Sequence, residues 1–381
     1  MSNKNVVLII TGRYLPGYKD GGPVRSIRNL VDWLGDRYDI RIMCLDRDHG
    51  DTKPYSDIRM DEWNFVGQAK VWYVENFDAR TIAKLSEEAD VVYCCGPYSD
   101  YAIATMRLKK NGMIKAPLYV ASMGSFSPEA FALKGRKKQV FVKIMRCLGM
   151  FKKVIWSVTS EREQEELRAV IGSDAKCVIA SDLPREGVTR HTGEKVKDSI
   201  RLIFLSRIAR KKNLSFVPEI LKQVESKYNV LIDIYGIAED EEYLGECQQL
   251  FDQLPESVKW EYKGEVDSEK VPEIFASYDA FIFPTLGENY GHVIAESLAA
   301  GCIPIISDKT PWMDLDAHGC GYVCNLEDSS EFAGVINNLA AMSNEEYNVL
   351  IHKSYDYIKK VNETSVTNSG YKIIFDLAYD N

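Results

Sequence analysis

Short apolar runs alternate with amphipathic segments along the whole of this 381-residue chain. The runs are rich in Val and Ile and are continuous rather than alternating, which is typical of parallel strands covered on both faces. In the first half the runs are 5–11, 39–46, 70–74, 90–95, 118–122, 154–159 and 176–180. A second series comprises 200–206, 229–235, 258–262, 280–284, 303–307 and 321–324. This order of elements predicts an α/β fold built from doubly wound sheets.

The helical patterns lie between these runs and after the last of them. They cover 24–34, 80–88, 214–226, 239–253, 291–300, 344–360 and 370–379. Residues 183–199 contain Pro, Gly and mixed charge without apolar periodicity, which indicates a linker. We therefore expect a first domain at 1–190, a second domain at 191–365, and a C-terminal segment at 366–381 that packs back on the first domain.

Composition and charge narrow the class of protein. Apolar residues make up 45% of the chain and charged residues 27%, which is the balance of a soluble globular protein. The net charge of −9 argues against a nucleic-acid-binding protein, which would present a basic face. The first apolar run predicts a buried strand rather than a signal peptide. The nine cysteines include no C-x-x-C pair and are interpreted as reduced thiols, so we expect a cytoplasmic protein.

The richest candidate site follows the run at 280–284. A loop with two glycines leads from this run into a helix that begins near Gly291. Such a helix start offers backbone N–H groups and the positive end of a dipole, which suits a phosphate group. Glu288 lies in the loop, where a carboxylate can accept hydrogen bonds from sugar hydroxyls, and Glu296 lies within the helix. We expect each carboxylate to hold a different part of an extended ligand.

A basic cluster directly follows the run at 200–206, at the sheet edge where ligands of such folds bind. Arg207 and Lys212 are candidates to bind a diphosphate, because charge-assisted hydrogen bonds best answer its negative charge. Arg210 and Lys211 are expected to face solvent.

These two segments together resemble the signature of the retaining nucleotide-sugar glycosyltransferases of family 4, the glycosyl transferases group 1. The family's Gly-Arg-Leu-x-x-x-Lys-Gly pattern is matched by residues 206–213, with Asn213 in place of the second Gly. The resemblance implies a GT-B fold, in which two Rossmann-like domains face a central cleft. It also implies roles for Glu288 at the transferred sugar and Glu296 at the ribose, with Glu288, Arg207 and Lys212 as the catalytic residues. The donor-binding residues that it implies are Gly22, Arg207, Lys212, Glu288, Asn289, Tyr290, Gly291 and Glu296.

The first domain carries the features expected of an acceptor side. Gly21 and Gly22 precede a helix, as in the family's first loop, although a simple helix start explains them almost as well. Many family members place a histidine after a central strand, but the matching segment 118–128 has none. Met123, Gly124 and Ser125 are therefore expected only to line the acceptor side. We expect retention to proceed by same-face attack, in which the donor's own phosphate takes the acceptor proton.

A basic amphipathic segment lies at 134–153 and holds eight Lys or Arg and no acidic residue. Apolar residues fall at helical spacing within it, namely Val140, Phe141, Ile144, Met145, Leu148 and Phe151. Such a helix either lies on an anionic membrane, at the inner face of the cell membrane, or packs its apolar side in the domain core. Both interpretations are open from the sequence.

The sequence thus predicts a glycosyltransferase that moves a sugar, preferably from a UDP-sugar, to a glycan or polyprenyl-linked acceptor in surface polysaccharide biosynthesis. We expect neither a cofactor nor a metal ion, because the two Asp-x-Asp triplets, 46–48 and 314–316, are not joined to a phosphate-binding loop. Two alternatives stay open. One is a nucleotide-sugar epimerase of the same fold, and the other is a non-catalytic sugar-nucleotide-binding subunit.

Overall fold

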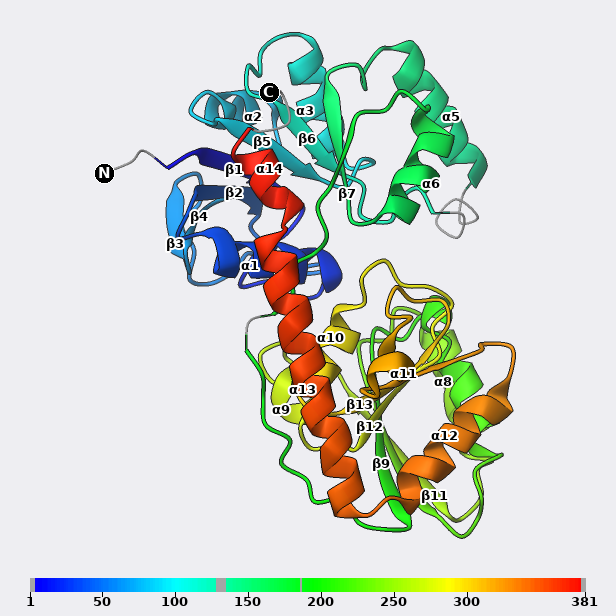
Figure 1. The fold of residues 1–381 in the computed structure, drawn as a ribbon. Helices are drawn as coiled ribbons and strands as arrows, with labels where there is room; N and C mark the ends of the chain where they lie inside the picture. The colour runs from blue at the N-terminus through cyan, green and yellow to red at the C-terminus, as the bar shows by residue number, and fades with distance from the viewer. Residues whose placement is uncertain (1–3, 128–134, 186, 378–381) are drawn as a thin grey trace. The chain divides into compact units, whose positions relative to one another are not determined.

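The structure is a computed structural model that describes residues 4–127, 135–185 and 187–377. The chain forms two compact units (Figure 1). Unit 1 comprises Met1–Glu186 with Thr364–Asn381, and unit 2 comprises Gly187–Glu363. The sequence placed these divisions at 190/191 and 365/366. Residues 1–3, 134 and 378–381, which belong to the predicted first domain, basic segment and C-terminal segment, lie outside the described residues.

Within its described residues, unit 1 contains an eight-stranded sheet in the order β3-β4-β2-β1-β5-β6-β7-β8. The strands are β1 (Val6–Ile10), β2 (Asp39–Leu45), β3 (Trp63–Val66), β4 (Ala69–Val74), β5 (Val91–Cys95), β6 (Leu118–Ala121), β7 (Val154–Val158) and β8 (Cys177–Ile179). All neighbours pair in parallel except β3 and β4, which are antiparallel. The sequence pattern did not predict β3, because this edge strand forms no continuous apolar run. The side chain of Phe65 in it is 81% exposed.

The sheet of unit 1 has an apolar core on each face. Val7 and Ile9 pack into one core and Leu8 and Ile10 into the other, as alternation along a strand requires. The helices are α1 (Gly22–Leu34), α2 (Ala79–Ser86), α3 (Asp100–Lys110), α5 (Gly135–Cys147), α6 (Glu161–Ile171) and α14 (Gly370–Phe375). The last of these, α14, packs its apolar side chains into the core that contains Val7. The end of the chain is thereby part of unit 1.

Unit 2 contains, among its described residues, a six-stranded parallel sheet in the order β11-β10-β9-β12-β13-β14. The strands are β9 (Ser199–Leu205), β10 (Asn229–Tyr235), β11 (Val258–Gly264), β12 (Ala280–Phe283), β13 (Ile303–Ser307) and β14 (Tyr322–Cys324). The α-helices are α7 (Val217–Leu221), α8 (Glu241–Phe251), α9 (Val271–Phe275), α10 (His292–Ala299), α11 (Leu315–His318), α12 (Ser329–Ala341) and α13 (Asn344–Thr367), whose residues 364–367 belong to unit 1. Figure 1 shows α12 and α13 on opposite sides of this sheet. The two predicted doubly wound α/β domains are confirmed.

The predicted helix at 214–226 is shorter in the structure. A 3₁₀ turn at Leu214–Phe216 precedes α7, which ends at Leu221. Pro218 lies in the first turn of α7, where its missing N–H costs nothing. Beyond the helix, the backbone N–H of Glu225 donates to the side chain of Asn337 in α12, at 3.0 Å. The chain after α7 is therefore held by a neighbouring helix instead of continuing its own.

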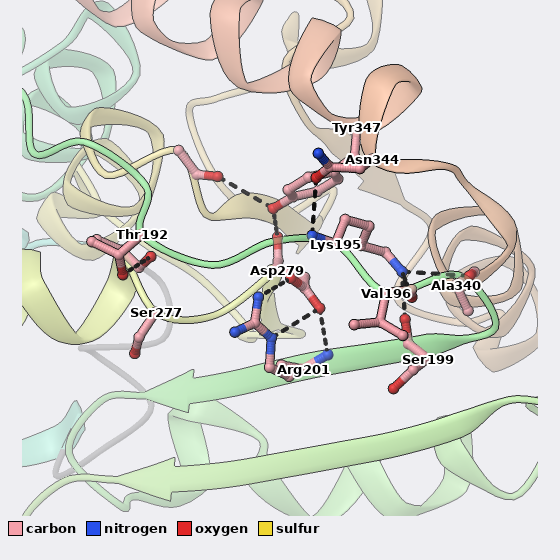
Figure 2. Close-up of polar contacts among 12 residues, drawn as sticks. Thr192, Lys195, Val196, Ser199, Arg201, Ser277, Asp279, Ala340, Asn344 and Tyr347 are labelled. Carbon is pink, nitrogen blue, oxygen red and sulfur yellow. Dashed lines mark hydrogen bonds and ion pairs between the residues drawn. The ribbon is translucent and has the colours of Figure 1, made fainter.

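The segment interpreted as a linker is attached to unit 2 from Thr189 onward. The backbone N–H groups of Thr189 and Thr192 donate to carbonyls of other parts of the unit, at 2.9 and 2.8 Å. The Lys195 side chain, which is 5% exposed, donates to the carbonyls of Val196 at 2.8 Å and of Ala340 at 3.4 Å (Figure 2). Polar contacts therefore attach residues 189–199 to unit 2, although their sequence has no apolar periodicity.

Candidate active site

The two predicted clusters follow neighbouring strands and meet at the same sheet edge. Because β9 and β12 are parallel neighbours, the segments that follow them, 206–213 and 284–291, leave the sheet together. The carbonyl of Lys211 accepts the N–H of Leu286 at 2.9 Å and the hydroxyl of Thr285 at 3.2 Å. The structure thus joins the basic cluster to the glycine-containing loop through their backbones.

Lys212 and Glu288 form an ion pair within this junction. Their side chains are 14% and 13% exposed, so water reaches them only in part. The Lys212 ammonium also lies 5.4 Å from the centre of the Phe283 ring, at the end of β12. The predicted diphosphate-binding cation and the predicted sugar-binding carboxylate are therefore direct neighbours.

Asn213 has the backbone conformation that explains its place in the motif. Its φ of 58° and ψ of 39° lie in the left-handed region, which glycine adopts freely and asparagine tolerates better than most residues. The Asn213 side chain donates to the carbonyl of Pro284 at 3.0 Å, across the junction of the two loops. Asparagine at this position therefore takes a conformation that suits glycine, and its side chain links the two loops.

Arg207 lies at the same edge but is more exposed than Lys212. Its guanidinium pairs with the carboxylate of Glu239, and the two side chains are 47% and 43% exposed. Arg210 is 57% exposed and pairs with Asp240 and Glu246, outside the junction of the two loops. Arg207 can thus turn toward a ligand by leaving one surface partner, whereas Arg210 is engaged elsewhere.

Gly236, at the end of β10, lies against the turn after β9. A Cβ atom on it would lie 1.7 Å from the carbonyl oxygen of Ser206, and its φ is 145°. Beyond this contact, the N–H of Ile208 donates to Ile237 and that of Glu239 to Ile208, at 2.8 and 3.1 Å. Glycine is therefore required at position 236 by a close backbone approach.

Helix α10 begins where the phosphate site was predicted. Gly291 is its N-cap residue with a φ of 82°, and Glu296 lies in the helix with 8% exposure. The loop before the helix is anchored by the segment after β13. The N–H of Glu288 donates to the carbonyl of Lys309 at 3.1 Å, and the indole N–H of Trp312 donates to Tyr290 at 2.5 Å.

Trp312 therefore helps to hold the loop before α10 in place. Its exposure of 5% and its hydrogen bond to Tyr290 place it in the core.

The other predicted residues lie in unit 1. Gly22 is the exposed first residue of α1, and space for a Cβ is open around it. Met123, Gly124 and Ser125 follow β6 and are half-buried. Met123 and Gly124 have φ values of 49° and 70°, which is unusual for a residue with a side chain such as Met123.

Neither Asp-x-Asp triplet forms a group of metal ligands in the structure. Asp48 accepts the backbone N–H groups of Tyr18 at 2.8 Å and Lys19 at 3.1 Å, so its carboxylate orders the loop before α1. Asp314 accepts the hydroxyl of Tyr357 at 2.7 Å. Among residues 4–127, 135–185 and 187–377, no three His, Cys, Asp or Glu side chains are placed to hold a metal ion.

Helix α5, in the basic segment, has two apolar faces rather than one. Met145 is buried in the core of unit 1, and Phe141 packs beside it. Val140, Ile144 and Leu148, four residues apart, are instead exposed by 56%, 52% and 54%. Core packing therefore explains only part of the apolar pattern. None of the helices in the described part of the chain is long and apolar enough to cross a bilayer.

Three carboxylates at these sheet edges were missed by the sequence interpretation. Glu239 pairs with Arg207, Asp48 orders the loop before α1, and Glu163 contacts the segment after β6. The signal for Glu163 was present, because Ser160 and Glu163 have the spacing of a capping box and Ser160 is the N-cap of α6. The roles of Glu239 and Asp48 depend on tertiary contacts that no local sequence pattern indicates.

This architecture is that of the GT-B glycosyltransferases. The structure of sucrose-phosphate synthase from Thermosynechococcus elongatus aligns with a TM-score of 0.70 at 12% identity, over 99% of this chain and 100% of that one. HepE of Anabaena, in complex with UDP and glucose, aligns with a TM-score of 0.67 at 14% identity, over 99% of both chains. WaaG, a glycosyltransferase involved in lipopolysaccharide biosynthesis, aligns with a TM-score of 0.65 at 12% identity, over 97% of this chain and 99% of that one. The predicted GT-B fold is confirmed.

Sequence comparison finds a family profile that matches one of the two units. Residues 188–356, nearly all of unit 2, match the profile of the family described as glycosyl transferases group 1. An uncharacterized glycosyltransferase of Methanocaldococcus jannaschii is 23% identical over 121 residues, which cover 32% of this chain. That match spans only 30% of the relative's length. Fold and profile together support a glycosyltransferase.

Proposed function

We propose that this chain is a retaining glycosyltransferase of family 4, which transfers a sugar from a UDP-sugar to a glycan or polyprenyl-linked acceptor without a metal ion. The observation that carries the proposal is the junction of the two loops in unit 2. It pairs Lys212 with Glu288 beside the N-terminus of α10. This arrangement offers a cation, a carboxylate and a helix dipole to one ligand, which suits a diphosphate linked to a sugar.

In the proposed complex, Lys212 and Arg207 bind the diphosphate, and each leaves its carboxylate partner to do so. Glu288, released from Lys212, accepts hydrogen bonds from hydroxyls of the transferred sugar. The backbone of residues 289–291 faces the sugar and the phosphate, and Glu296 holds the ribose. The structures of HepE with UDP and glucose make UDP our preferred nucleotide. The two cations would neutralise the leaving diphosphate, the task that a metal ion performs in other glycosyltransferases.

The transfer step follows from the same groups. The bond between the anomeric carbon and the diphosphate oxygen breaks, and the acceptor oxygen bonds to that carbon from the same face. The acceptor proton goes to the departing phosphate oxygen, so no protein base is required. Met123–Ser125 in unit 1 line the acceptor side in this scheme.

Nucleotide binding is tested by melting the protein with UDP, GDP and ADP. A ligand at 100 times its dissociation constant stabilises the native state by about 2.7 kcal/mol. We expect UDP to raise the melting temperature of the wild type, and Lys212→Ala to lose most of that shift. Arg210→Ala is the matched control, because this cation pairs outside the junction. Equal shifts in the two variants would contradict the proposed site.

Transfer is tested with UDP-glucose and a panel of p-nitrophenyl hexosides as surrogate acceptors, with products identified by mass spectrometry. We expect transfer that persists in EDTA and that Glu288→Gln abolishes. Conversion of UDP-glucose to an isomeric nucleotide sugar without an acceptor would instead identify the epimerase. UDP binding without any chemistry would identify the non-catalytic subunit.

The exposed face of α5 supports a peripheral contact with an anionic membrane. Val140, Ile144 and Leu148 form an apolar stripe, and exposed basic side chains flank it, among them Lys137, Lys143, Arg146, Lys152 and Lys153. Apolar insertion beside cationic side chains suits an anionic lipid surface, with about 1 kcal/mol for each basic residue near it. A lipid-linked acceptor would place the enzyme at such a surface.

Membrane contact is tested by co-sedimentation with vesicles that contain phosphatidylglycerol. Ile144→Glu should weaken binding, whereas Val349→Glu should not, because Val349 is equally exposed (53%) but lies on α13 in unit 2. Equal binding of both variants and the wild type would argue that α5 does not contact lipid.

A further inference from the structure

A buried carboxylate in unit 1 holds together the two segments that follow β6 and β7. Glu163 lies in the first turn of α6 and is 2% exposed. One oxygen, Oε1, accepts the Ser122 hydroxyl at 2.7 Å and the Gly124 N–H at 2.5 Å. The other oxygen, Oε2, accepts the Thr159 N–H at 2.6 Å and the Thr159 hydroxyl at 2.8 Å. Each oxygen therefore serves one segment.

The segment that Oε1 holds has an unusual backbone. Met123 and Gly124 both have positive φ values, 49° and 70°. Such conformations persist only where the surroundings determine them, and they gather at ligand-binding sites. The hydrogen bond to the N–H of Gly124 is one such determinant. Without Glu163, this backbone N–H and the strained residue before it would lose the contact that keeps them in place.

The position of this cluster is that of a ligand site. Both segments leave the carboxyl edge of the sheet, where α/β folds bind their ligands. Helix capping alone does not account for the contacts, because a capping residue would serve its own helix. Glu163 instead accepts half of its hydrogen bonds from a segment that lies earlier in the chain. Its partners there, Ser122 and Gly124, precede it by 41 and 39 residues.

We infer that Glu163 is a positioning residue of the acceptor site, which fixes Met123–Ser125 in the arrangement that receives the acceptor. The assignment of Glu163 to an acceptor site rests on the proposed transferase function. The hydrogen bonds of Glu163 to the two segments do not depend on that function. Glu163 touches no substrate in this scheme and acts through the backbone that it holds.

The contact is tested by amide hydrogen exchange of the full-length protein. Glu163→Ala removes the acceptor of both segments, so we expect the amides of Gly124 and Thr159 to exchange at least about tenfold faster. Glu163→Gln keeps the shape but turns an NH₂ group toward one of the two amides, so one of them should exchange faster even if the alanine variant folds poorly. Glu165→Gln is the control, because this exposed residue lies on the same helix. Unchanged exchange at both amides in Glu163→Gln would overturn the inference.

The purpose is tested by kinetics with UDP-glucose and the best p-nitrophenyl hexoside. We expect Glu163→Gln to raise the KM for the hexoside about tenfold, and to leave the UDP-induced melting shift and the KM for UDP-glucose within about twofold. Equal KM values for the hexoside in the variant and the wild type would overturn the assignment to the acceptor site. A wild type that transfers to no hexoside and binds no UDP would overturn the proposed function, while the exchange result would still decide the contact.

Discussion

Replacement of Asp279 by alanine tests how much the ion pair between Asp279 and Arg201 stabilises unit 2. Asp279 precedes β12, and its side chain is 3% exposed. It accepts the Arg201 guanidinium at 2.6 Å and the Arg201 backbone N–H at 2.8 Å (Figure 2). The Tyr347 hydroxyl donates to the backbone carbonyl of Asp279, a contact that alanine would keep. The substitution therefore removes the carboxylate and its contacts to Arg201 and leaves the contact to Tyr347 in place.

The magnitude follows from the burial of the two partners. Removal of one partner from a buried ion pair costs about 3–5 kcal/mol, because the other is left without compensation. The Arg201 side chain is 32% exposed and can regain some water, so we expect about 2–4 kcal/mol here. In a domain of this size each kcal/mol lowers the melting temperature by about 2–4 °C, which gives a decrease of about 4–16 °C.

The assay is differential scanning calorimetry of the full chain, with UDP binding measured well below the transition. Glu256→Ala, an exposed change in the same unit, should lower the transition by less than about 2 °C. UDP affinity should be unchanged in Asp279→Ala, because Asp279 lies at the amino end of β12 and the donor loop follows its carboxyl end. A decrease as small as that of the control would refute the stabilising role of the pair. Loss of UDP binding in the folded variant would refute the expectation that changes at the amino end of β12 do not affect the donor loop at its carboxyl end.

Two further predictions concern backbone space and pH. Gly236→Ala should destabilise unit 2 by about 2 kcal/mol or more and weaken UDP binding, because its Cβ would lie 1.7 Å from the carbonyl oxygen of Ser206. Gly245→Ala in the middle of α8, where nothing lies within 4 Å of the added Cβ, should instead stabilise by about 0.5–1 kcal/mol; calorimetry distinguishes the two. Burial lowers the pKa of His191 below 6.5, so the unfolded chain takes up its proton first as the pH falls. Stability should therefore decrease on acidification below about pH 6.5, and His191→Phe should flatten that decrease in melting curves recorded between pH 7 and 5.

The strands were predictable because the physics that forms them is local to each run. A central parallel strand is buried on both faces, so its residues are apolar without interruption, as in β12 and β13. The edge strand β3 lacks this property and was missed. The helix predicted at 214–226 failed for a different reason, since its second half finds a partner in α12 that no periodicity reveals.

The candidate site was predictable only in part. The neighbouring positions of Lys212 and Glu288, 76 residues apart, follow from the pairing of β9 with β12, and the resemblance supplied the expectation that both matter. Glu163 carried a local signal, but a capping box indicates a helix start and does not name a second segment 39 residues away as a partner. Glu239, which pairs with Arg207, and Asp48, which orders the loop before α1, carried no signal in the sequence, because the tertiary structure determines their partners.

Departures from a motif are best judged by the backbone that the motif serves. Asn213 replaces a glycine of the family pattern, yet its left-handed conformation is one that glycine adopts freely, and its side chain donates a hydrogen bond to the facing loop. Gly236, by contrast, has no room for a Cβ, which would lie 1.7 Å from the carbonyl oxygen of Ser206. The chain therefore has glycine where a Cβ would clash and accepts asparagine where only the dihedral angle is demanding.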